Sequence, residues 1–232
     1  MGPSGWVRVG VSPALAQAVI APSLSGLYRQ HPGLHIDLAA DDRMVDMTRE
    51  GIDIAIRTGH TASENVVARQ IGEYGRTLCA SPAYLNEHGT PTTLDDLAQH
   101  RLVASSVNPV LNRWPLRPTG PLVEAPSPGA PVPTRRAAFQ PGTAYWDIQG
   151  HTRSDNSAAT LALVLDGVGM ARLSDLVARP LLASGALVPV LVDCFDPQIV
   201  PIYAVMLPER HRLPKVRACI DWWQAWLASP TP

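Results

Sequence analysis

Charge is scarce in this sequence, and neither sign is in large excess. Asp, Glu, Lys and Arg make up 17% of the 232 residues, and the formal net charge at pH 7 is −1. The sequence pI is about 6.6. A chain that binds nucleic acid or an anionic membrane by itself generally carries a basic field, which this composition does not provide. The composition therefore counts against direct DNA binding by these residues.

Long hydrophobic runs are also missing. No apolar stretch approaches the roughly 20 residues that a helix needs to cross a bilayer, so we expect no membrane partner. The first residues, MGPSGW, show no charged leader followed by an apolar segment. We therefore expect no secretory signal and a cytoplasmic location.

Cysteine and clustered histidine, the usual ligands of structural zinc, are too few or too scattered to build a metal site. Three widely spaced cysteines indicate reduced thiols rather than a disulfide framework or a zinc site. His31 and His35 are four residues apart, but Pro32-Gly33 between them prevents a shared helical face. We expect neither a metal nor a cofactor. The three cysteines are Cys79, Cys194 and Cys219.

Motifs for catalysis or nucleotide binding are absent too. The sequence has no Gly-x-Ser-x-Gly nucleophile elbow and no phosphate-binding loop. Gly167-Val168-Gly169 follows a helical pattern rather than a strand, so we expect it to end a helix. Asp41 and Asp42 would suit an acid–base pair, yet a position at a helix N-terminus explains both as carboxylates stabilised by the helix dipole. We therefore expect no enzymatic activity.

The residues that are present indicate an α/β fold. At 46% apolar, the 232 residues can form one large domain or two small lobes around buried cores. Trp6–Val11 and Leu34–Ala39 have strand patterns, and Ser12-Pro13 between them combines a favoured N-cap with a favoured first helical residue. The order strand, helix, strand, helix, strand predicts a parallel sheet with helical crossovers.

The stretch Asp41–Gly59 combines three predicted features. Two acidic residues open a short helix that Gly51 ends. Ile52–Ile56 then reads as a strand buried on both faces. At its carboxyl end Arg57 and Thr58 enter a loop, and ligands of open α/β sheets bind at that edge. The pattern favours a small-molecule site, with a solvent-exposed arginine as the alternative.

Further strands and helices alternate to the end of the chain. Nine prolines between Pro109 and Pro141 predict an extended, irregular insertion over about 109–145. The final helix carries an aromatic stripe, which suits either the core or a partner. The predicted strands are 77–80, 101–105, 170–173, 187–192 and 199–207, and the predicted helices are 82–88, 93–97, 158–165, 175–182 and 214–227.

Taken in order, the segments DIAIRTG, LCASPAYL and DLAQHRL resemble the effector-binding domain of LysR-type transcriptional regulators, and the resemblance covers nearly all of the chain outside the proline-rich insertion. It implies two Rossmann-like lobes joined by two crossover strands, the type 2 periplasmic-binding-protein-like fold. The first lobe would comprise residues 6–74 plus 200–228, and the second residues 75–199 with the insertion.

The resemblance also implies a function. Family members bind a small metabolite, often an anion, between the lobes and assemble as homodimers or tetramers. Family members contact DNA through an N-terminal winged helix-turn-helix domain, which is absent from this chain. We interpret the chain as an excised regulatory domain rather than as a regulator that has lost its DNA-binding domain. A free-standing solute-binding protein of a transport system is the alternative, and an enzyme built on this fold is a third.

The expected site lies where helix starts and strand ends meet. A helix N-terminus exposes unpaired N–H groups and a partial positive charge, which suit a carboxylate effector. The resemblance supports Ser12, Asp41 and Ser105-Ser106 as pocket positions, while simple helix or turn capping is the alternative for each serine. The predicted effector-binding residues are Ser12, Pro13, Asp41, Arg57, Thr58, Ser105, Ser106, Asn156 and Ser157.

One segment departs from the family pattern. Ala171-Arg172-Leu173-Ser174 stands where the family usually shows a proline. Arg172 would add a cation to the cleft or merely cap the surface. Because of this departure and the insertion near the pocket rim, the resemblance does not imply which effector is bound.

Overall fold

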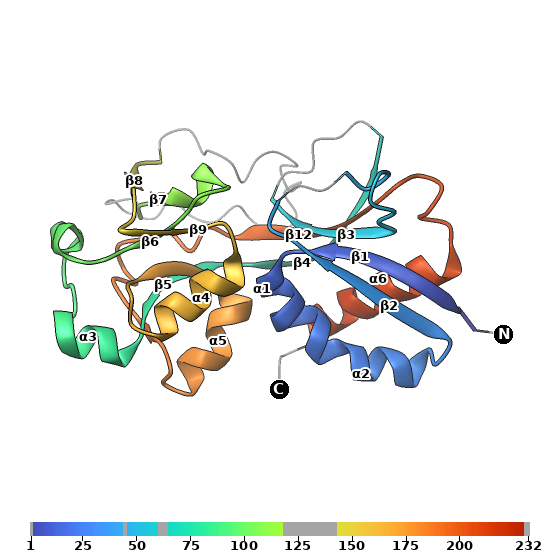
Figure 1. Cartoon of the computed structure of the whole chain (residues 1–232), viewed down its shortest axis with the longest axis horizontal. Coiled ribbons are helices and arrows are strands. Elements are labelled where there is room, and N and C mark those ends of the chain that lie inside the picture. Colours follow the sequence, from blue (N-terminus) through green and yellow to red (C-terminus); the bar gives the residue numbers. More distant parts are fainter. Residues whose placement is uncertain (1, 44–45, 60–64, 118–142, 230–232) are drawn as a thin grey trace, which may run out of the picture.

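A computed structural model of the chain describes residues 2–43, 46–59, 65–117 and 143–229. The elements form two lobes that lie end to end along the long axis of the molecule (Figure 1). The strands are β1 (Gly5–Val11), β2 (Leu34–Ala40), β3 (Ile54–Thr58), β4 (Val67–Tyr74), β5 (Arg76–Ala80), β6 (Val103–Ser105), β7 (Arg113–Pro115), β8 (Tyr145–Asp147), β9 (Thr152–Ser154), β10 (Ala171–Ser174), β11 (Val188–Pro189) and β12 (Val200–Met206).

The helices alternate with these strands as an α/β fold requires. Within the described residues, none is long and apolar enough to cross a membrane. The helical elements are α1 (Pro13–Leu15), the π-helix η1 (Ala16–Ile20), α2 (Ala21–Gln30), α3 (Pro82–His88), the 3₁₀ helices η2 (Asp95–Gln99) and η3 (Pro109–Asn112), α4 (Ser157–Leu165), α5 (Asp175–Ala183) and α6 (Pro214–Ala228).

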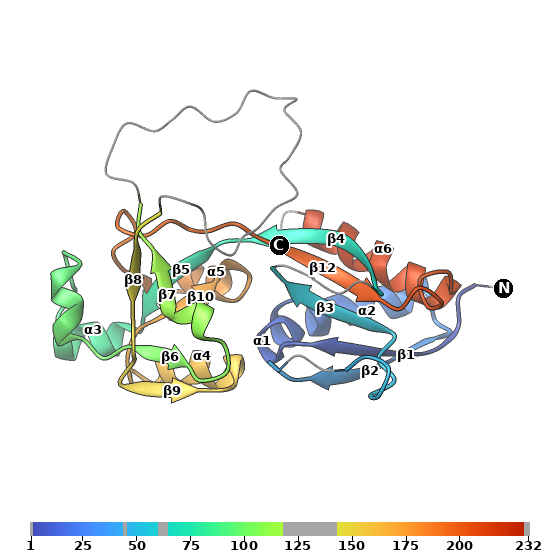
Figure 2. The ribbon, with the colours of Figure 1, turned by 90° about the horizontal axis from the view of Figure 1, so that it is seen from above.

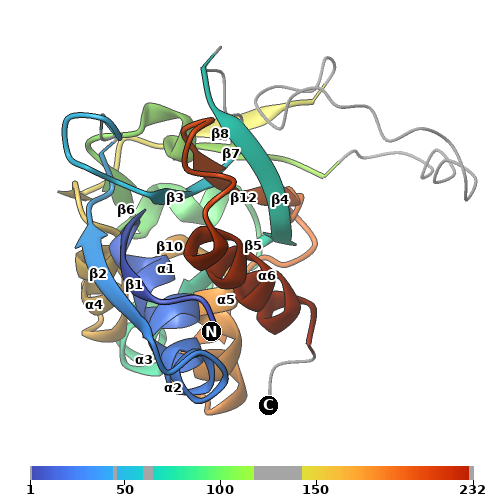
Figure 3. The ribbon, with the colours of Figure 1, turned by 90° about the vertical axis from the view of Figure 1, so that its right-hand side faces the viewer.

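The first lobe is built on a five-stranded sheet of order β2-β1-β3-β12-β4. β1 pairs in parallel with β2 and β3, as the strand–helix–strand order predicts. β12, from the end of the chain, enters between β3 and β4 and pairs antiparallel with both. The helices α2 and α6 pack against one another on one face of this sheet (Figure 3).

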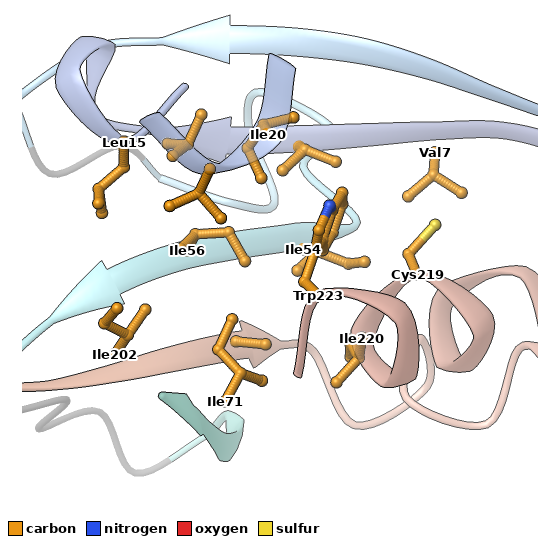
Figure 4. Close-up of a cluster of buried hydrophobic side chains, with 14 of the residues drawn as sticks. Val7, Leu15, Ile20, Ile54, Ile56, Ile71, Ile202, Cys219, Ile220 and Trp223 are labelled. Atoms are coloured by element: carbon orange, nitrogen blue, oxygen red, sulfur yellow. The ribbon is translucent and has the colours of Figure 1, made fainter. Parts of the chain in front are cut away.

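Strand β3 is covered on both faces, as its apolar sequence predicts. Ile54 and Ile56 point into the main core of the first lobe, where Ile54 lies beside the fully buried Trp223 (Figure 4). Ala55 points to the opposite face, where it packs in a smaller cluster with Met47. A strand buried on both faces exposes only its ends, which is why Arg57 and Thr58 at its carboxyl end are its accessible side chains.

The aromatic stripe on α6 belongs to the core. Trp223 is 0% exposed and its Nε1 donates to Ser23 Oγ at 3.2 Å. Trp222 donates to the carbonyl of Ser23 at 3.1 Å and lies so close to Gly26 that a Cβ there would meet its ring at 2.5 Å. The core alternative is confirmed for Val216, Ile220 and Trp223, which are buried, and contact with a partner through the half-buried Trp222 and Trp226 stays a prediction.

The predicted helix over 41–50 is wrong for the described residues. Met47–Gly51 forms a single turn: Asp46 Oδ1 caps its start by accepting from the N–H groups of Thr48 and Arg49, and Gly51 ends it five residues later. Gly51 adopts the expected left-handed conformation, with φ 66°. The predicted Met44 and Val45 lie outside the described residues.

The predicted boundaries of the following strand also need correction. β3 begins at Ile54 rather than Ile52, and it includes Arg57 and Thr58, which the sequence pattern places in a loop. The cause is non-local: Tyr203 and Ile202 of β12 pair with these two residues and extend the strand.

The second lobe has a sheet of order β10-β5-β11 and a parallel pair β6-β9, linked by a bridge between Leu102 and Met170. The predicted strand 187–192 shrinks to β11, because Leu191 takes a left-handed φ of 49°. The proline-rich insertion is not wholly irregular, since it contains η3 and β7, and β7 pairs with β8. The rest of the insertion, residues 118–142, lies outside the described residues.

Local capping works in this lobe as the sequence predicts. Ser81 Oγ accepts from the N–H of Tyr84 at the start of α3. Gly167, with φ 77°, ends α4: its N–H and that of Val168 donate back to carbonyls of the last turn at 3.1 and 2.9 Å. This Schellman arrangement explains the glycine without a dinucleotide.

Two adjacent chain segments connect the lobes, as Figure 2 shows from above. β4 passes directly into β5 through Gly75, and the segment before β12 returns beside it. The N–H of Arg76 donates to the carbonyl of Pro197 at 2.8 Å, so the two crossovers are hydrogen-bonded together. A Cβ on Gly75 would meet Asp175 Oδ2 at 2.4 Å, which shows how closely the second lobe packs on this crossover.

Candidate functional site

A cavity of about 320 Å³ lies between the two lobes. Both lobes contribute side chains to its wall. Most of the wall is apolar, with a limited number of polar groups, as is common in small-molecule sites. The apolar residues include Val11, Leu15, Ile56, Val103, Leu111, Trp114, Leu161, Leu173 and Val177.

The structure brings seven of the nine predicted site residues to this cavity. The other two lie elsewhere: Pro13 is buried in the first turn of α1, and Ser106 is exposed. Ser106 points away because successive residues of an extended chain face opposite sides, and its N–H donates to the carbonyl of Ser154. The seven are Ser12, Asp41, Arg57, Thr58, Ser105, Asn156 and Ser157.

The hydroxyl and amide groups of this set also cap their own backbone. Ser12 Oγ accepts from the N–H of Leu15 at 3.3 Å, and Ser105 Oγ accepts from the N–H of Asn108 at 3.1 Å. Asn156 Oδ1 accepts from the first two N–H groups that follow Ser157, both at 3.0 Å. Both interpretations therefore hold: these side chains cap their own backbone segments and also line the cavity.

Four arginines line the cavity wall, and one of them, Arg43, pairs with Asp41. Arg57 ends β3, Arg76 begins β5 and Arg172 lies on β10. Burial lowers the pKa of the Arg57 guanidinium from its ordinary value. Arg76 donates to Tyr74 Oη at 3.0 Å and its guanidinium carbon lies 5.5 Å from the centre of that ring.

Arg172 is a buried cleft residue rather than a surface cap. Its side chain is held between the crossovers, where Nη2 donates to the carbonyl of Asp196 at 2.6 Å, and the residue is only 8% exposed. Its pKa is lowered to about 10, mainly by burial and also by the neighbouring Arg76, while Asp196 and Asp175 oppose the shift. The group stays cationic at neutral pH and adds to the positive field of the cleft.

The carboxylates at the cleft have partners of their own. Asp41 Oδ1 accepts from the N–H of Arg43 at 2.8 Å and lies 3.5 Å from its guanidinium. Asp42 accepts from the N–H of Ser157 on the opposite lobe. Ser157 Oγ accepts in turn from the N–H of Ala14 at 3.1 Å. The start of α4 is thus tied to the first lobe by two hydrogen bonds.

Sequence reasoning missed several lining residues. Arg76 follows the crossover glycine directly, and Gly75, an interruption between two strand-forming segments, is the sequence signal that points to it. Asn112 falls in the segment predicted to be irregular; its side chain donates to the carbonyl of Ser105 and accepts from its N–H, both at 2.8 Å. Asn112 therefore fixes the backbone of a predicted site residue.

Comparison with known proteins identifies the family. The family model described as LysR substrate binding domain matches residues 1–228. The chain belongs to the LysR substrate-binding domain family. Among curated relatives of this LysR domain, the uncharacterized HTH-type transcriptional regulator YhjC of Escherichia coli K12 is 31% identical over 81% of the chain and 56% of its own length. DmlR of the same strain is 29% identical over 99% of the chain and 68% of its length.

Solved structures of LysR-type regulators have the same fold as this chain. The regulatory domain of CrgA from Neisseria meningitidis superposes with a TM-score of 0.82 at 22% identity, covering 97% of this chain and all of that one. Full-length AphB of Vibrio cholerae gives a TM-score of 0.71 at 26% identity, covering 97% of this chain and 69% of that one. The periplasmic-binding-protein-like fold implied by the sequence is therefore confirmed. The chain spans about two thirds or less of the length of several curated regulators that it matches.

Proposed function

We propose that this LysR domain senses a small-molecule effector in the cavity between its lobes and thereby controls transcription by a longer regulator. One observation carries the proposal. Residues from both lobes, Arg57 from the first and Ser105 from the second, line one shared cavity. A ligand there contacts both lobes and so favours one arrangement of them.

The effector class that suits this wall is a small carboxylate with an apolar portion. Arg57, Arg76 and Arg172 provide cations, and guanidinium groups bind carboxylates with two parallel hydrogen bonds. The apolar wall suits the remainder of the molecule. Ser12, Asp41, Thr58 and Ser105 would complete the contacts from the two sides.

The proposed mechanism involves ligand binding and a change in lobe arrangement, with no covalent reaction. Residues 6–74 and 200–228 move as one lobe, residues 75–199 as the other, and the paired crossovers act as the hinge. A ligand shifts such an equilibrium only by its difference in affinity for the two states. The output is the geometry of a homodimer or tetramer, since symmetric assembly converts a movement within one chain into a changed spacing between copies.

The relatives support this function over the alternatives. YhjC, DmlR and TtdR of Escherichia coli are named HTH-type transcriptional regulators or activators, which disfavours a free-standing solute-binding protein and an enzyme. DNA would be contacted through a helix-turn-helix domain N-terminal to this one. Such a regulator would work in the cytoplasm, where its promoters lie.

A thermal-shift screen with small carboxylates tests the proposal. A ligand that binds only the native state raises its melting temperature. Arg57→Ala is expected to abolish the shift while the chain still folds, as judged by circular dichroism. Arg212→Ala, which removes an exposed arginine outside the cavity, is the matched control and retains the shift. Equal shifts in wild type and Arg57→Ala would remove Arg57 from the site.

A further inference from the structure

Two hydrogen bonds cross the cleft at a single residue, Ser157, the first residue of α4. Its N–H donates to Asp42 Oδ2, 115 residues away in the sequence, and its Oγ accepts from the N–H of Ala14 at 3.1 Å, 143 residues away. Asp42 and Ala14 belong to the first lobe and α4 to the second. The lobes are therefore in direct polar contact through this residue.

The N-terminus of α4 has its exposed donors taken by the protein itself. Asn156 Oδ1 accepts from the N–H groups of Ala158 and Ala159. The N–H of Ser157 lies beyond the reach of that cap and donates to Asp42 instead. A helix N-terminus carries a partial positive charge that favours a carboxylate. Asp42 thus occupies the position at which the sequence pattern predicts an effector carboxylate.

We infer that Asp42 acts as a clasp, a side chain that holds the N-terminus of α4 and stabilises the closed arrangement of the two lobes. The inference deepens the proposed function, because the closed state is the one that a ligand in the cleft would favour. It also assigns the acidic group of the effector to the guanidinium groups of Arg57, Arg76 and Arg172, since the start of α4 is already satisfied.

The arrangement of the lobes can be measured without any ligand. Fluorescent labels at Arg29→Cys on α2 and Glu87→Cys on α3 report the separation of the lobes, since both positions are exposed. The labels are placed in a Cys194→Ser background, because the other two native thiols are 0% exposed. Labelled chain is mixed with excess unlabelled chain, so that energy transfer occurs within one subunit.

Asp42→Ala is expected to lower the ratio of closed to open molecules by about tenfold, the effect of losing one hydrogen bond to a charged group. Asp46→Ala is the matched control, because this aspartate lies in the same segment and contacts only its own turn among the described residues. It is expected to leave the ratio unchanged. Asp42→Asn keeps an acceptor oxygen without the charge, and a smaller shift, about threefold, is expected.

Ser157→Pro removes the other half of the contact. Proline is favoured at the first position of a helix, and Asn156 already has the extended conformation, φ −131° and ψ 123°, that a following proline requires. The substitution removes the N–H donor and the hydroxyl together. A shift at least as large as that of Asp42→Ala is expected. Ser157→Ala keeps the donor and is expected to shift the ratio less.

The double variant Asp42→Ala/Ser157→Pro tests whether both substitutions shift the ratio of closed to open molecules through the same hydrogen bond. If they do, the double variant shows the ratio of Ser157→Pro alone, because the contact can be lost only once. Additive shifts, or an unchanged ratio in folded Asp42→Ala, would overturn the clasp. Neither result depends on an effector, so a metabolite screen that finds no ligand would count against the proposed function and leave the clasp standing.

Discussion

Asp53 Oδ1 accepts a hydrogen bond from Arg210 Nη1 at 2.6 Å, which joins the residue before β3 to the segment before α6. Asp53 is 6% exposed, and its other oxygen accepts from the N–H of Arg8 at 2.9 Å. Both oxygens of this buried carboxylate are therefore partnered, as burial of a charge requires.

Removal of Arg210 should destabilise the first lobe. Arg210→Ala leaves Asp53 buried with one backbone donor, and because the arginine side chain is 41% exposed, water replaces part of the lost contact. We expect a loss of about 1–3 kcal/mol in the free energy of unfolding. Arg69→Ala, which breaks the exposed pair with Asp221, should cost no more than about 1 kcal/mol. Equal losses in urea denaturation would contradict this assignment.

The stability of the protein should fall in mild acid because of His100. Tyr84 Oη accepts from the N–H of Arg101 at 2.8 Å and lies within hydrogen-bond distance of His100 Nδ1, 3.0 Å away. Burial lowers the pKa of His100 in the native state, and His88 lowers it further, while Asp96 opposes the shift.

The sign of the pH dependence follows from that shift. The unfolded chain keeps the ordinary histidine pKa of about 6.5 and binds a proton more readily than the native state. The contribution of His100 to the free energy of unfolding is therefore fully present above pH 6.5. It is lost as the pH falls through the lower pKa of the native state. His100→Asn should flatten the slope of unfolding free energy between pH 5 and 7 and cost about 1 kcal/mol at pH 7.5. His35→Asn, at an exposed site on β2, should retain the wild-type slope.

The three free thiols should differ sharply in reactivity. Burial raises the pKa of Cys79 and of Cys219 to about 12, with the charges of Asp175 and Asp53 adding to the respective shifts. The thiolate is the nucleophile, so both should resist iodoacetamide at pH 8. Cys194 is only half-buried. Intact mass should show one modification in native protein and three in denaturant, and modification of native Cys194→Ser would contradict this.

Trp223 should be the most costly tryptophan to truncate in the first lobe. It is 0% exposed and its indole N–H is hydrogen-bonded to Ser23 Oγ. Trp223→Ala leaves a cavity in the core and should lower the free energy of unfolding by about 3–5 kcal/mol. Trp6 is 64% exposed, so Trp6→Ala, the same change at the surface, should cost about 1 kcal/mol or less. Similar losses for both would contradict the core assignment of the α6 stripe.

Locally determined features were predictable from the sequence. Ser12, Ser81 and Gly167 act within their own helix ends, through contacts three to five residues away, and each was predicted. The helix over 41–50 was wrong, because the cap lies at Asp46 rather than at Asp41 and Gly51 follows so soon that only one turn fits between them. The end of β3 was wrong, because β12 joins it from more than 140 residues away.

In the candidate site, too, features set by local sequence were predictable and features set by contacts between distant segments were not. Ser12, Arg57 and Ser105 were predicted to share one hollow because each follows or ends a strand, and strand ends meet at one edge of a sheet. They do line one cavity. The hydrogen bond between Asp42 and Ser157 depends on how the two lobes meet, and no local pattern encodes that distance. The lobe boundaries and the effector contacts stay predictions.

The hydrogen bond between Arg76 and Pro197 joins the two connections between the lobes into a narrow ribbon. A ribbon bends readily across its flat side and resists shear within its plane. We therefore expect the lobes to approach and separate along one dominant coordinate, with little sideways sliding. A molecule in the cavity needs to alter only that coordinate to change how the two lobes are placed relative to one another.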